Sequence, residues 1–342
     1  MAPGRGPSRA LAPLIGLLLA VAIVVVPVSP AAADPAGPTD YRTEIVAVEP
    51  ATPAIELDII GGDSFVELRS EPGTEVDVVG YEGEPYLRFD ADGRVWQNDR
   101  SPSRWLNDDR YGGAEIPPSA DGDAEPDWIE VADDGTYAWH DHRAHWMNPS
   151  RPLGAEPGDT ILEAVIPLVV DDQAVAVAVR SDLLAPPSPV PALLGVASAL
   201  PLAWLVWRRR TSGPAAAVAV AALVGGWAVL ATVVGIGSVL GLPAEAAPGA
   251  SQWLLPALAA VAVGAALLVV RRQLLAPPLR ALVLPAALAL AAVELLIWVW
   301  LRRESVVRAL IPTVAPEWLD RLVVAGAAAT GLVAMVAAAI AA

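Results

Sequence analysis

Short runs in which apolar and polar residues alternate occupy the first half of the chain, and long unbroken apolar runs occupy the second half. Alternation with a period of two residues predicts β-strands that bury one face. About 20 consecutive apolar residues suffice for a helix to cross the hydrocarbon core of a bilayer. The pattern therefore predicts an all-β domain followed by an all-α transmembrane bundle of five helices.

The alternating part, residues 34–186, is punctuated by turn signals such as Gly61-Gly62-Asp63. The predicted strands cover residues 43–48, 55–60, 65–69, 76–80, 86–90, 94–96, 128–131, 136–142, 161–170 and 174–180. We expect the last four to form two hairpins, with turns at residues 133–135 and 171–173. Many short strands at this spacing favour an antiparallel sandwich of immunoglobulin-like type.

The segment from residue 97 to residue 127 fits neither period well. A loop of this length in a compact domain is often functional. Its first half interleaves Trp105 and Tyr111 with charged side chains of both signs, whereas its second half is rich in proline, glycine and aspartate. We therefore expect an ordered flap as far as Gly113 and a solvated excursion after it.

Apolar segments follow a proline-rich linker and make up a transmembrane domain at residues 187–342. They cover residues 190–207, 215–242, 253–270, 281–301 and 322–342. If the β-domain lies outside the cell, the arginine-rich loops at residues 208–210 and 271–280 lie in the cytoplasm, as the positive-inside rule requires. We expect a multi-pass cell-membrane protein with an extracytoplasmic N-terminal domain and a cytoplasmic C-terminus.

Residues 1–33 have the pattern of a signal peptide. Arg5 and Arg9 precede an apolar run at residues 11–28, and small residues follow it. An uncleaved anchor is the alternative, because the apolar run is long for a signal sequence. Both interpretations place the following domain outside the cytoplasm.

Charge divides the chain in the same way. Residues 34–182 contain 10 arginines and 33 acids, a net charge of −23, whereas the rest of the chain carries +7. An acidic domain repels phosphate, which argues against nucleic acid as a partner and leaves the lipid bilayer and a protein of the cell envelope. The chain contains no cysteine, so disulfides and thiolate metal ligands are excluded.

All 3 histidines of the chain lie in the segment WHDHRAHWM, residues 139–147. On the strand predicted here, alternation places His140 and His142 together on one face, outside the core, and the bulky aromatic residues on the core face. Two imidazoles at this spacing can reach one metal ion. His145 joins them only if the chain turns at Arg143-Ala144.

A metal bound by these nitrogens would be Cu(II) or Zn(II), because imidazole suits both ions. Side chains that could support such a site are Asp99, Asp108, Asp109, Asp141, Arg143 and Met147. Two other interpretations stay open: the histidines hydrogen-bond to carbonyls and carboxylates of the flap, or they form a pH-responsive cluster. No Ser-His-Asp spacing, phosphate loop or dinucleotide fingerprint appears, which favours binding over catalysis.

Glu294 is the single charge well inside a predicted helix, in the sequence AVELLIW. Carboxylates inside a membrane are costly and are therefore functional candidates by default. One interpretation is proton-coupled transport through Glu294. The other is a protonated side chain that hydrogen-bonds to Thr232, Ser238 or a backbone carbonyl.

Three segments resemble a group of uncharacterised actinobacterial membrane proteins: GEPYLRFDADG at residues 83–93, WLNDDRYG at residues 105–112 and GTYAWHDHRAHWM at residues 135–147. The order of signal peptide, β-domain and C-terminal helices is similar too. The resemblance implies this architecture and location and carries no activity. In layout the chain is also similar to periplasmic copper-binding β-sandwich domains attached to membrane modules, although no ligand pattern of those domains matches.

Two functional hypotheses follow. In the first, a membrane-anchored extracytoplasmic domain binds Cu(II) or Zn(II) through its histidines. In the second, the protein is a structural or interaction protein of the cell envelope, and the histidines belong to a hydrogen-bond network.

Overall fold

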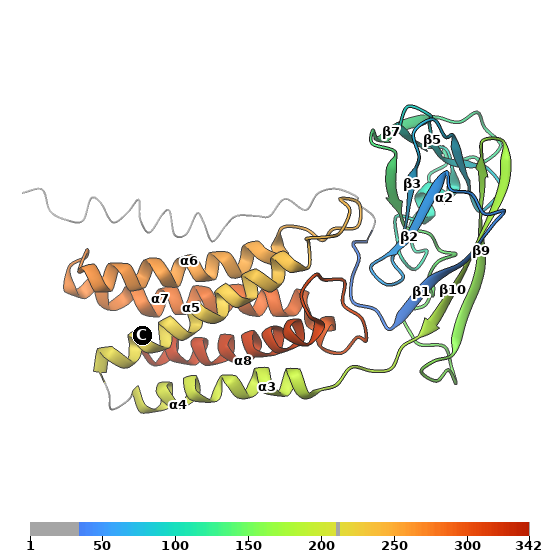
Figure 1. Ribbon diagram of the computed structural model, residues 1–342. Helices are drawn as coiled ribbons and strands as arrows, with labels where there is room; N and C mark the ends of the chain where they lie inside the picture. The colour runs from blue at the N-terminus through green and yellow to red at the C-terminus, as the bar shows by residue number, and fades with distance from the viewer. Residues whose placement is uncertain (1–33, 210–212, 342) are drawn as a thin grey trace, which may run out of the picture.

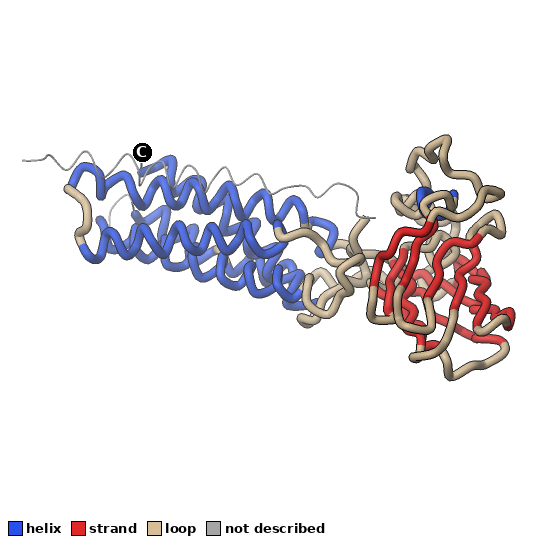
Figure 2. The backbone as a smooth tube through the Cα atoms, turned by 90° about the horizontal axis from the view of Figure 1, so that it is seen from above, coloured by secondary structure: helices blue, strands red, loops and turns tan. Residues whose placement is uncertain are grey.

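The computed structural model describes residues 34–209 and 213–341 and divides them into a β-domain and a bundle of long helices (Figure 1). Figure 2 shows that the strands and the long helices occupy separate ends of the molecule, with loops between them. The signal peptide expected at residues 1–33 lies outside the described residues.

Two antiparallel sheets form the β-domain. The larger sheet has the order β1 (Tyr41–Glu49), β10 (Gln173–Leu183), β9 (Thr160–Val170), β4 (Val76–Val79), β5 (Pro85–Phe89), β6 (Val95–Asn98) and β7 (Trp128–Ala132). The smaller sheet has the order β2 (Ile55–Ile60), β3 (Phe65–Ser70) and β8 (Thr136–Trp139).

The two sheets share one apolar core. Val66 and Leu68 of β3 and Trp139 of β8 pack in one cluster with Leu87 and Phe89 of β5, and all five side chains are buried. The prediction of an antiparallel β-domain is therefore confirmed. The immunoglobulin-like type of that domain remains a prediction.

One expected hairpin is confirmed and the other is wrong. β9 and β10 pair through a two-residue turn at Asp171 and Asp172, whose φ angles of 46° and 64° match the left-handed turn that suits strand twist. β7 and β8 instead belong to different sheets. Between them, the N–H of Gly135 donates to the Gly93 carbonyl of the β5–β6 turn, and its carbonyl accepts from Ser70 at the end of β3. The turn therefore links the two sheets.

The flap contains a short helix that periodicity did not predict, α2 (Pro102–Leu106). Its first turn is held by Glu84, a buried carboxylate outside the helix, which accepts hydrogen bonds from the hydroxyls of Ser101 (2.6 Å) and Ser103 (2.7 Å). Burial raises the pKa of Glu84, but these hydroxyls outweigh burial and hold its pKa below the usual value. A five-residue helix is too short to show a period, so this long-range cap defines it.

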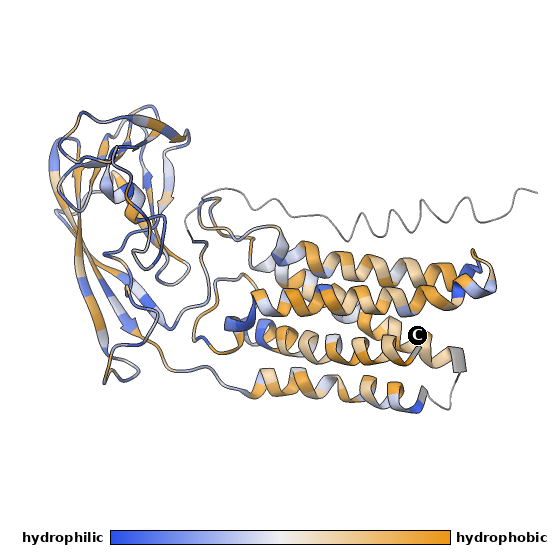
Figure 3. Ribbon diagram, turned by 180° about the vertical axis from the view of Figure 1, so that it is seen from behind, coloured by the Kyte–Doolittle hydropathy of each residue, from blue (hydrophilic) through white to orange (hydrophobic). Residues whose placement is uncertain are grey.

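The helical part consists of α3 (Val190–Ser198), α4 (Leu200–Arg209), α5 (Gly213–Gly237), α6 (Ser251–Arg272), α7 (Pro277–Leu301), the short 3-10 helix η2 (Arg303–Val306) and α8 (Glu317–Ala341). Among the described residues, 5 segments are long and apolar enough to cross a membrane, which confirms the predicted number. The first segment is divided between α3 and α4, because Pro201 has no N–H to continue α3. Figure 3 shows apolar residues along the length of the helices.

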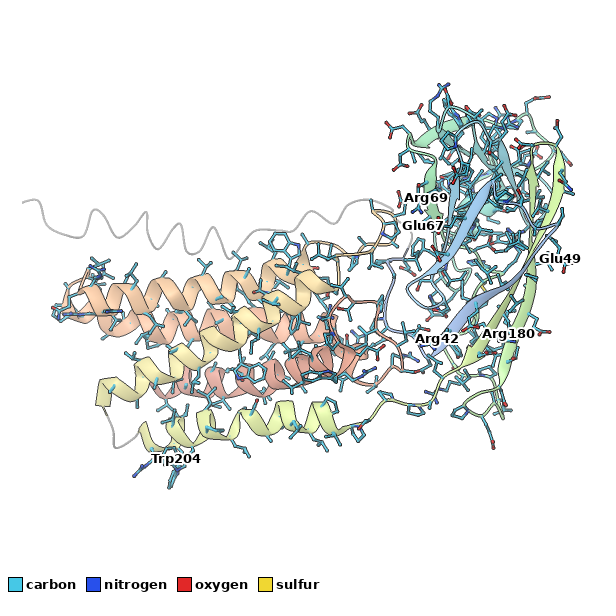
Figure 4. All side chains as sticks on the ribbon, viewed as in Figure 1. Arg42, Glu49, Glu67, Arg69, Arg180 and Trp204 are labelled. Carbon is cyan, nitrogen blue, oxygen red and sulfur yellow. The ribbon has the colours of Figure 1, made fainter. Side chains whose placement is uncertain are left out.

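Close approach of the helices depends on small residues. A Cβ atom at Gly235 of α5 would lie 1.8 Å from the carbonyl oxygen of Gln252 in α6, so only glycine fits there. At the bundle end remote from the β-domain, Trp204 projects outward from α4, as Figure 4 shows. Its ring lies 4.8 Å from the Arg208 guanidinium. Aromatic and basic side chains in this position are typical of a membrane–water interface.

The β-domain docks on the other end of the bundle. Thr39 and Leu310 exchange backbone hydrogen bonds of 3.0 and 2.9 Å, which joins the start of the domain to the loop before α8. The buried carboxylate of Asp40 accepts from Arg308 (2.9 Å) and from the backbone of Ala309 (3.1 Å), and it also pairs with Arg151 of the β-domain (3.0 Å). Asp40 is therefore the main polar contact between the two parts.

We expect Asp40→Ala to loosen this docking by about 1–3 kcal/mol, because two arginines lose a buried partner. This loss should make backbone hydrogen exchange at residues 308–310 of the full chain faster, by about tenfold for each 1.4 kcal/mol. Asp92→Ala, which removes a largely exposed pair with Arg94, is the control and should change little. Unchanged exchange in Asp40→Ala would contradict this role.

Candidate metal centre

The histidine segment leaves the β-sheet directly after β8. Strand pairing ends at Trp139, and the N–H of Ala144 donates to the carbonyl of Asp141 (2.9 Å), so residues 141–144 form a tight turn. This turn includes the Arg143-Ala144 step at which a bend was required. It brings His145 back beside His140, with 4.5 Å between the ring centroids.

Three imidazoles thus converge on one volume. The ring centroid of His142 lies 5.4 Å from that of His145 and 5.8 Å from that of His140, with the rings nearly perpendicular in both pairs. One nitrogen from each ring can be chosen so that all three lie within 4.8 Å of one another. Two nitrogens bound to one zinc ion are separated by at most about 4.2 Å, so small side-chain movements would close the site.

The site is more buried than the alternation of the strand predicted. His140 and His145 are buried and His142 is half-buried, because the alternating pattern stops at Trp139 and the turn folds the rings inward. Phe65 packs edge-on against His140 at 5.5 Å. The expectation that His140 and His142 lie outside the core is therefore wrong for His140, whereas His142 stays partly exposed.

Two of the three rings are oriented by backbone carbonyls. Because a carbonyl only accepts, Nε2 of His142 donates to Asp109 (2.9 Å) and Nδ1 of His145 donates to Trp146 (3.2 Å). This leaves a lone pair on Nδ1 of His142 and on Nε2 of His145. Metal-bound histidines are usually held in this way by a hydrogen bond from their other nitrogen.

Several ring nitrogens at the centre have no partner. Nε2 of His145 and both ring nitrogens of His140 are buried without a hydrogen bond to any other described residue. The backbone of Ser64 influences His140 without meeting regular hydrogen-bond geometry. Buried polar atoms without a partner are costly and point to a bound ion or water.

The imidazoles are neutral at physiological pH. Burial, followed by the charge of Arg110, lowers the pKa of His140 to about 3. Burial, followed by His140 and Arg110, lowers the pKa of His145 to about 2, and burial also lowers that of His142. The direction is opposite to that expected from an acidic domain, because burial outweighs distant charge. Neutral imidazole is the form that binds metals.

The six supporting residues proposed from the sequence divide into two groups. The carboxylates of Asp99 and Asp108 both pair with Arg104, at 3.0 and 2.8 Å, and neither belongs to the histidine group. The carboxylate of Asp109 instead accepts from backbone N–H groups at residues 111 and 113, while its carbonyl reaches His142.

The other three supporting residues adjoin the histidines. Asp141 and Arg143 form a buried ion pair at 2.8 Å inside the turn. Met147 is partly exposed, and its methyl group and His142 both border Gly112 of the flap. One arginine, one carboxylate and one thioether thus border the histidines.

Sequence reasoning missed two residues that hold the site. The Tyr81 hydroxyl accepts from the backbone N–H of His142 (2.8 Å), and the Tyr81 ring stacks on the imidazole at 5.8 Å. Arg110 of the flap pairs with the fully buried Asp63 at 2.5 Å. Both contacts join segments more than 40 residues apart, so no local pattern could have indicated them.

Glu294 lies apart from this site, in the buried interior of α7. Its Oε2 has no hydrogen-bond partner among residues 34–209 and 213–341. The hydroxyls of Thr232 and Ser238 donate to carbonyls of their own helix, at Ala228 and Gly235, each at 2.8 Å. Neither hydroxyl therefore donates to Glu294, although each hydroxyl oxygen keeps a lone pair that can accept from a protonated carboxyl.

Comparison with protein-family models, with curated proteins and with solved structures found no match. The assignment of a function therefore rests on the geometry of the site.

The lowered pKa values give the site a defined pH dependence. An unfolded histidine takes up a proton near its ordinary pKa of about 6.5, whereas His140 and His145 stay neutral to much lower pH when folded. The stabilisation that comes from keeping these histidines neutral is therefore complete above about pH 6.5 and is lost as the pH falls below that value. We expect the metal-free protein to lose about 2 kcal/mol of unfolding free energy per buried histidine between pH 7 and pH 5.

Chemical unfolding of the full chain with a chelator present measures this change. His140→Phe, which keeps an aromatic ring against Phe65 and cannot titrate, should remove about half of the loss. A pH dependence equal to that of the wild type would show that His140 is not a buried neutral group.

Proposed function

We propose that this protein is a membrane-anchored extracytoplasmic protein whose β-domain binds one Cu(II) or Zn(II) ion through His140, His142 and His145. The observation that carries the proposal is the convergence of three neutral imidazoles, with one nitrogen of each within 4.8 Å of the others. The two hydrogen bonds that orient His142 and His145, and the unpartnered nitrogens of His140 and His145, support it.

The choice of metal follows from the ligands. Nitrogen ligands without thiolates favour Cu(II) and Zn(II) over hard cations such as Mg²⁺ or Ca²⁺, which prefer oxygen. Three protein ligands are also the number found in zinc sites that keep a position for water. We assign no reaction to such a water, because the carboxylates that act on the histidines are already engaged. Asp141 pairs with Arg143, and Asp109 accepts from the backbone N–H groups of residues 111 and 113.

A second candidate function is supported by a different contact. The hydrogen bond from His142 to the Asp109 carbonyl ties the flap to the turn, and Tyr81 adds a further contact to the same histidine. In this interpretation the histidines form a structural network in a domain that meets an envelope protein. The two candidates predict different effects of the same substitutions.

If the metal proposal is right, the full-length protein in detergent should bind one ion per chain, measured by elemental analysis and by calorimetry. His140→Ala and His145→Ala should each abolish stoichiometric binding. An ion at 100 times its dissociation constant should stabilise the wild type by about 2.7 kcal/mol and neither variant. Asp109→Asn, which keeps the carbonyl that orients His142, is the matched control and should bind normally.

The structural network predicts the reverse. The wild type would carry no metal, and His142→Ala would lower the free energy of unfolding by about 1–3 kcal/mol through loss of the flap contact. A metal-free wild type combined with a destabilised His142→Ala would therefore exclude the metal centre and favour the envelope-interaction role.

The proposal also includes an orientation in the membrane, with the β-domain outside the cell. It further includes a cleaved signal peptide at residues 1–33, an immunoglobulin-like type for the β-domain and kinship with the actinobacterial group. Support comes from the arginine-rich termini of the helices: Arg208, Arg271, Arg272 and Arg280 all lie at the bundle end remote from the β-domain. Basic loops without acidic residues mark the cytoplasmic side, whereas arginines at the other end, such as Arg302, Arg308 and Arg321, pair with acids there.

Cysteine labelling tests this orientation cleanly in a cysteine-free chain. An impermeant thiol reagent added to intact cells should label Ser119→Cys in the exposed part of the flap loop. It should spare Leu274→Cys, which is exposed in the loop between α6 and α7. Lysis should make both accessible. The opposite pattern in intact cells would invert the proposed topology.

A further inference from the structure

One face of α7 carries polar groups from the outer end of the bundle into its interior. Glu294, Trp298 and Arg302 follow one another at intervals of four residues, which places them on the same side of the helix. All three are buried, with exposed fractions of 5%, 0% and 5%. A helix rises about 1.5 Å per residue, so Glu294 lies about 12 Å deeper in the bundle than Arg302.

A cavity opens beside the outer member of this series. It has a volume of about 150 Å³ and lies between the first segment of the β-domain, including Pro35 and Pro38, and the outer ends of α5, α6 and α7. Its polar lining is formed by Ser238, Gln252, Arg302 and Ser305. A space of this size with several polar groups can hold ordered water.

Arg302 anchors the cavity and keeps one donor unused. Its guanidinium forms an ion pair with Asp320 of α8 and a hydrogen bond of 3.0 Å with the side chain of Gln252. The remaining Nε is buried and has no partner in the described part of the chain. An unsatisfied guanidinium nitrogen on a cavity wall favours water there.

Trp298 lies between Glu294 and the cavity-lining Arg302 on this face of α7, and its indole binds Gln252, which also lines the cavity. Pro256 in α6 has no N–H, so the carbonyl of Gln252 four residues earlier lacks its helical donor. The Trp298 indole supplies that donor at 2.6 Å. In this antiparallel register, where Gln252 meets Trp298, Glu294 lies at the level of Pro256.

Glu294 has no counter-ion in the described bundle. The charged residues of the helices around it lie at the helix ends: Arg208, Arg209, Arg271, Arg272 and Arg280 remote from the β-domain, and Glu317, Asp320 and Arg321 near it. An ionised carboxylate without a partner is very costly inside a bilayer. The side chain is therefore protonated at rest, and its Oε2 is buried without a hydrogen-bond partner among the described residues.

We propose that Glu294 is a proton-binding site that exchanges with the outer side of the membrane through the cavity beside Arg302, with Trp298 as the gate. When the indole leaves the Gln252 carbonyl, cavity water reaches the carboxyl group. The carboxylic acid then releases its proton to that water, which gives a carboxylate and a hydronium ion, and rebinding reverses the step. This function is independent of the histidine site.

A hydrophobic carbodiimide reports this protonation directly. Only the protonated carboxyl adds across the carbodiimide, and the adduct rearranges to an N-acylurea that keeps the whole reagent, so mass spectrometry locates it. In sealed membrane vesicles with the β-domain outside, we expect labelling of Glu294 to fall as the external pH rises at fixed internal pH. Changing the internal pH alone should have no effect.

Two variants sharpen the test. Glu294→Gln should lose the label. Trp298→Phe keeps an aromatic ring but lacks the indole N–H, so its labelling should follow a step in external pH up to about tenfold faster, the scale of one hydrogen bond. Labelling that responds to internal pH, or no labelling of the folded wild type at any pH, would overturn the proposal. Failure of metal binding would leave this result unaffected.

Discussion

The turn built on the buried carboxylate of Asp141 is the interaction on which the candidate site depends. Asp141 accepts from the Trp139 indole and from the backbone and guanidinium of Arg143, and it is fully buried. Burial raises its pKa, but the hydrogen bonds and charge of Arg143 outweigh burial and hold that pKa below the usual value. Breaking a buried pair typically costs about 3–5 kcal/mol. The pair therefore fixes the turn that carries His145 back to His140.

The same strand that supports this turn also joins the β-domain to the membrane part. Near the start of β1, the Thr43 hydroxyl donates to the Ala144 carbonyl at 2.5 Å, which holds the histidine turn against the strand. Three residues earlier, Asp40 binds Arg308 from the bundle. A strand is stiff over so short a distance, and its hydrogen bonds to β10 fix it further. The histidine site and the outer end of the bundle are thus held in a fixed position relative to each other.

Features that depend on a local pattern of residues could be predicted from the sequence. Features that depend on contacts between distant segments could not. Most strands and the membrane-spanning helices could be predicted, because alternation and the length of an apolar run depend directly on which residues are buried. The histidines were located by their clustering, but their burial was not predicted, because it depends on a turn set by Asp141 and on packing against Phe65. The β7–β8 hairpin was wrong for a similar reason: two strands with a turn signal between them can join different sheets, and only contacts such as that between Gly135 and Ser70 decide which.

In the proposed metal site, acidic charge on the domain would attract cations, and the buried neutral imidazoles would select among them. Three neutral imidazoles leave the charge of a bound dication uncompensated, and the buried carboxylates of Asp141 and Asp63 are already balanced by Arg143 and Arg110. The compensating charge must therefore come from acids elsewhere on the domain, whose net charge is −23 over residues 34–182. Those charges act at a distance and raise the local concentration of any cation, in a way that salt screens. Discrimination between cations then falls to the buried nitrogens, which salt affects far less.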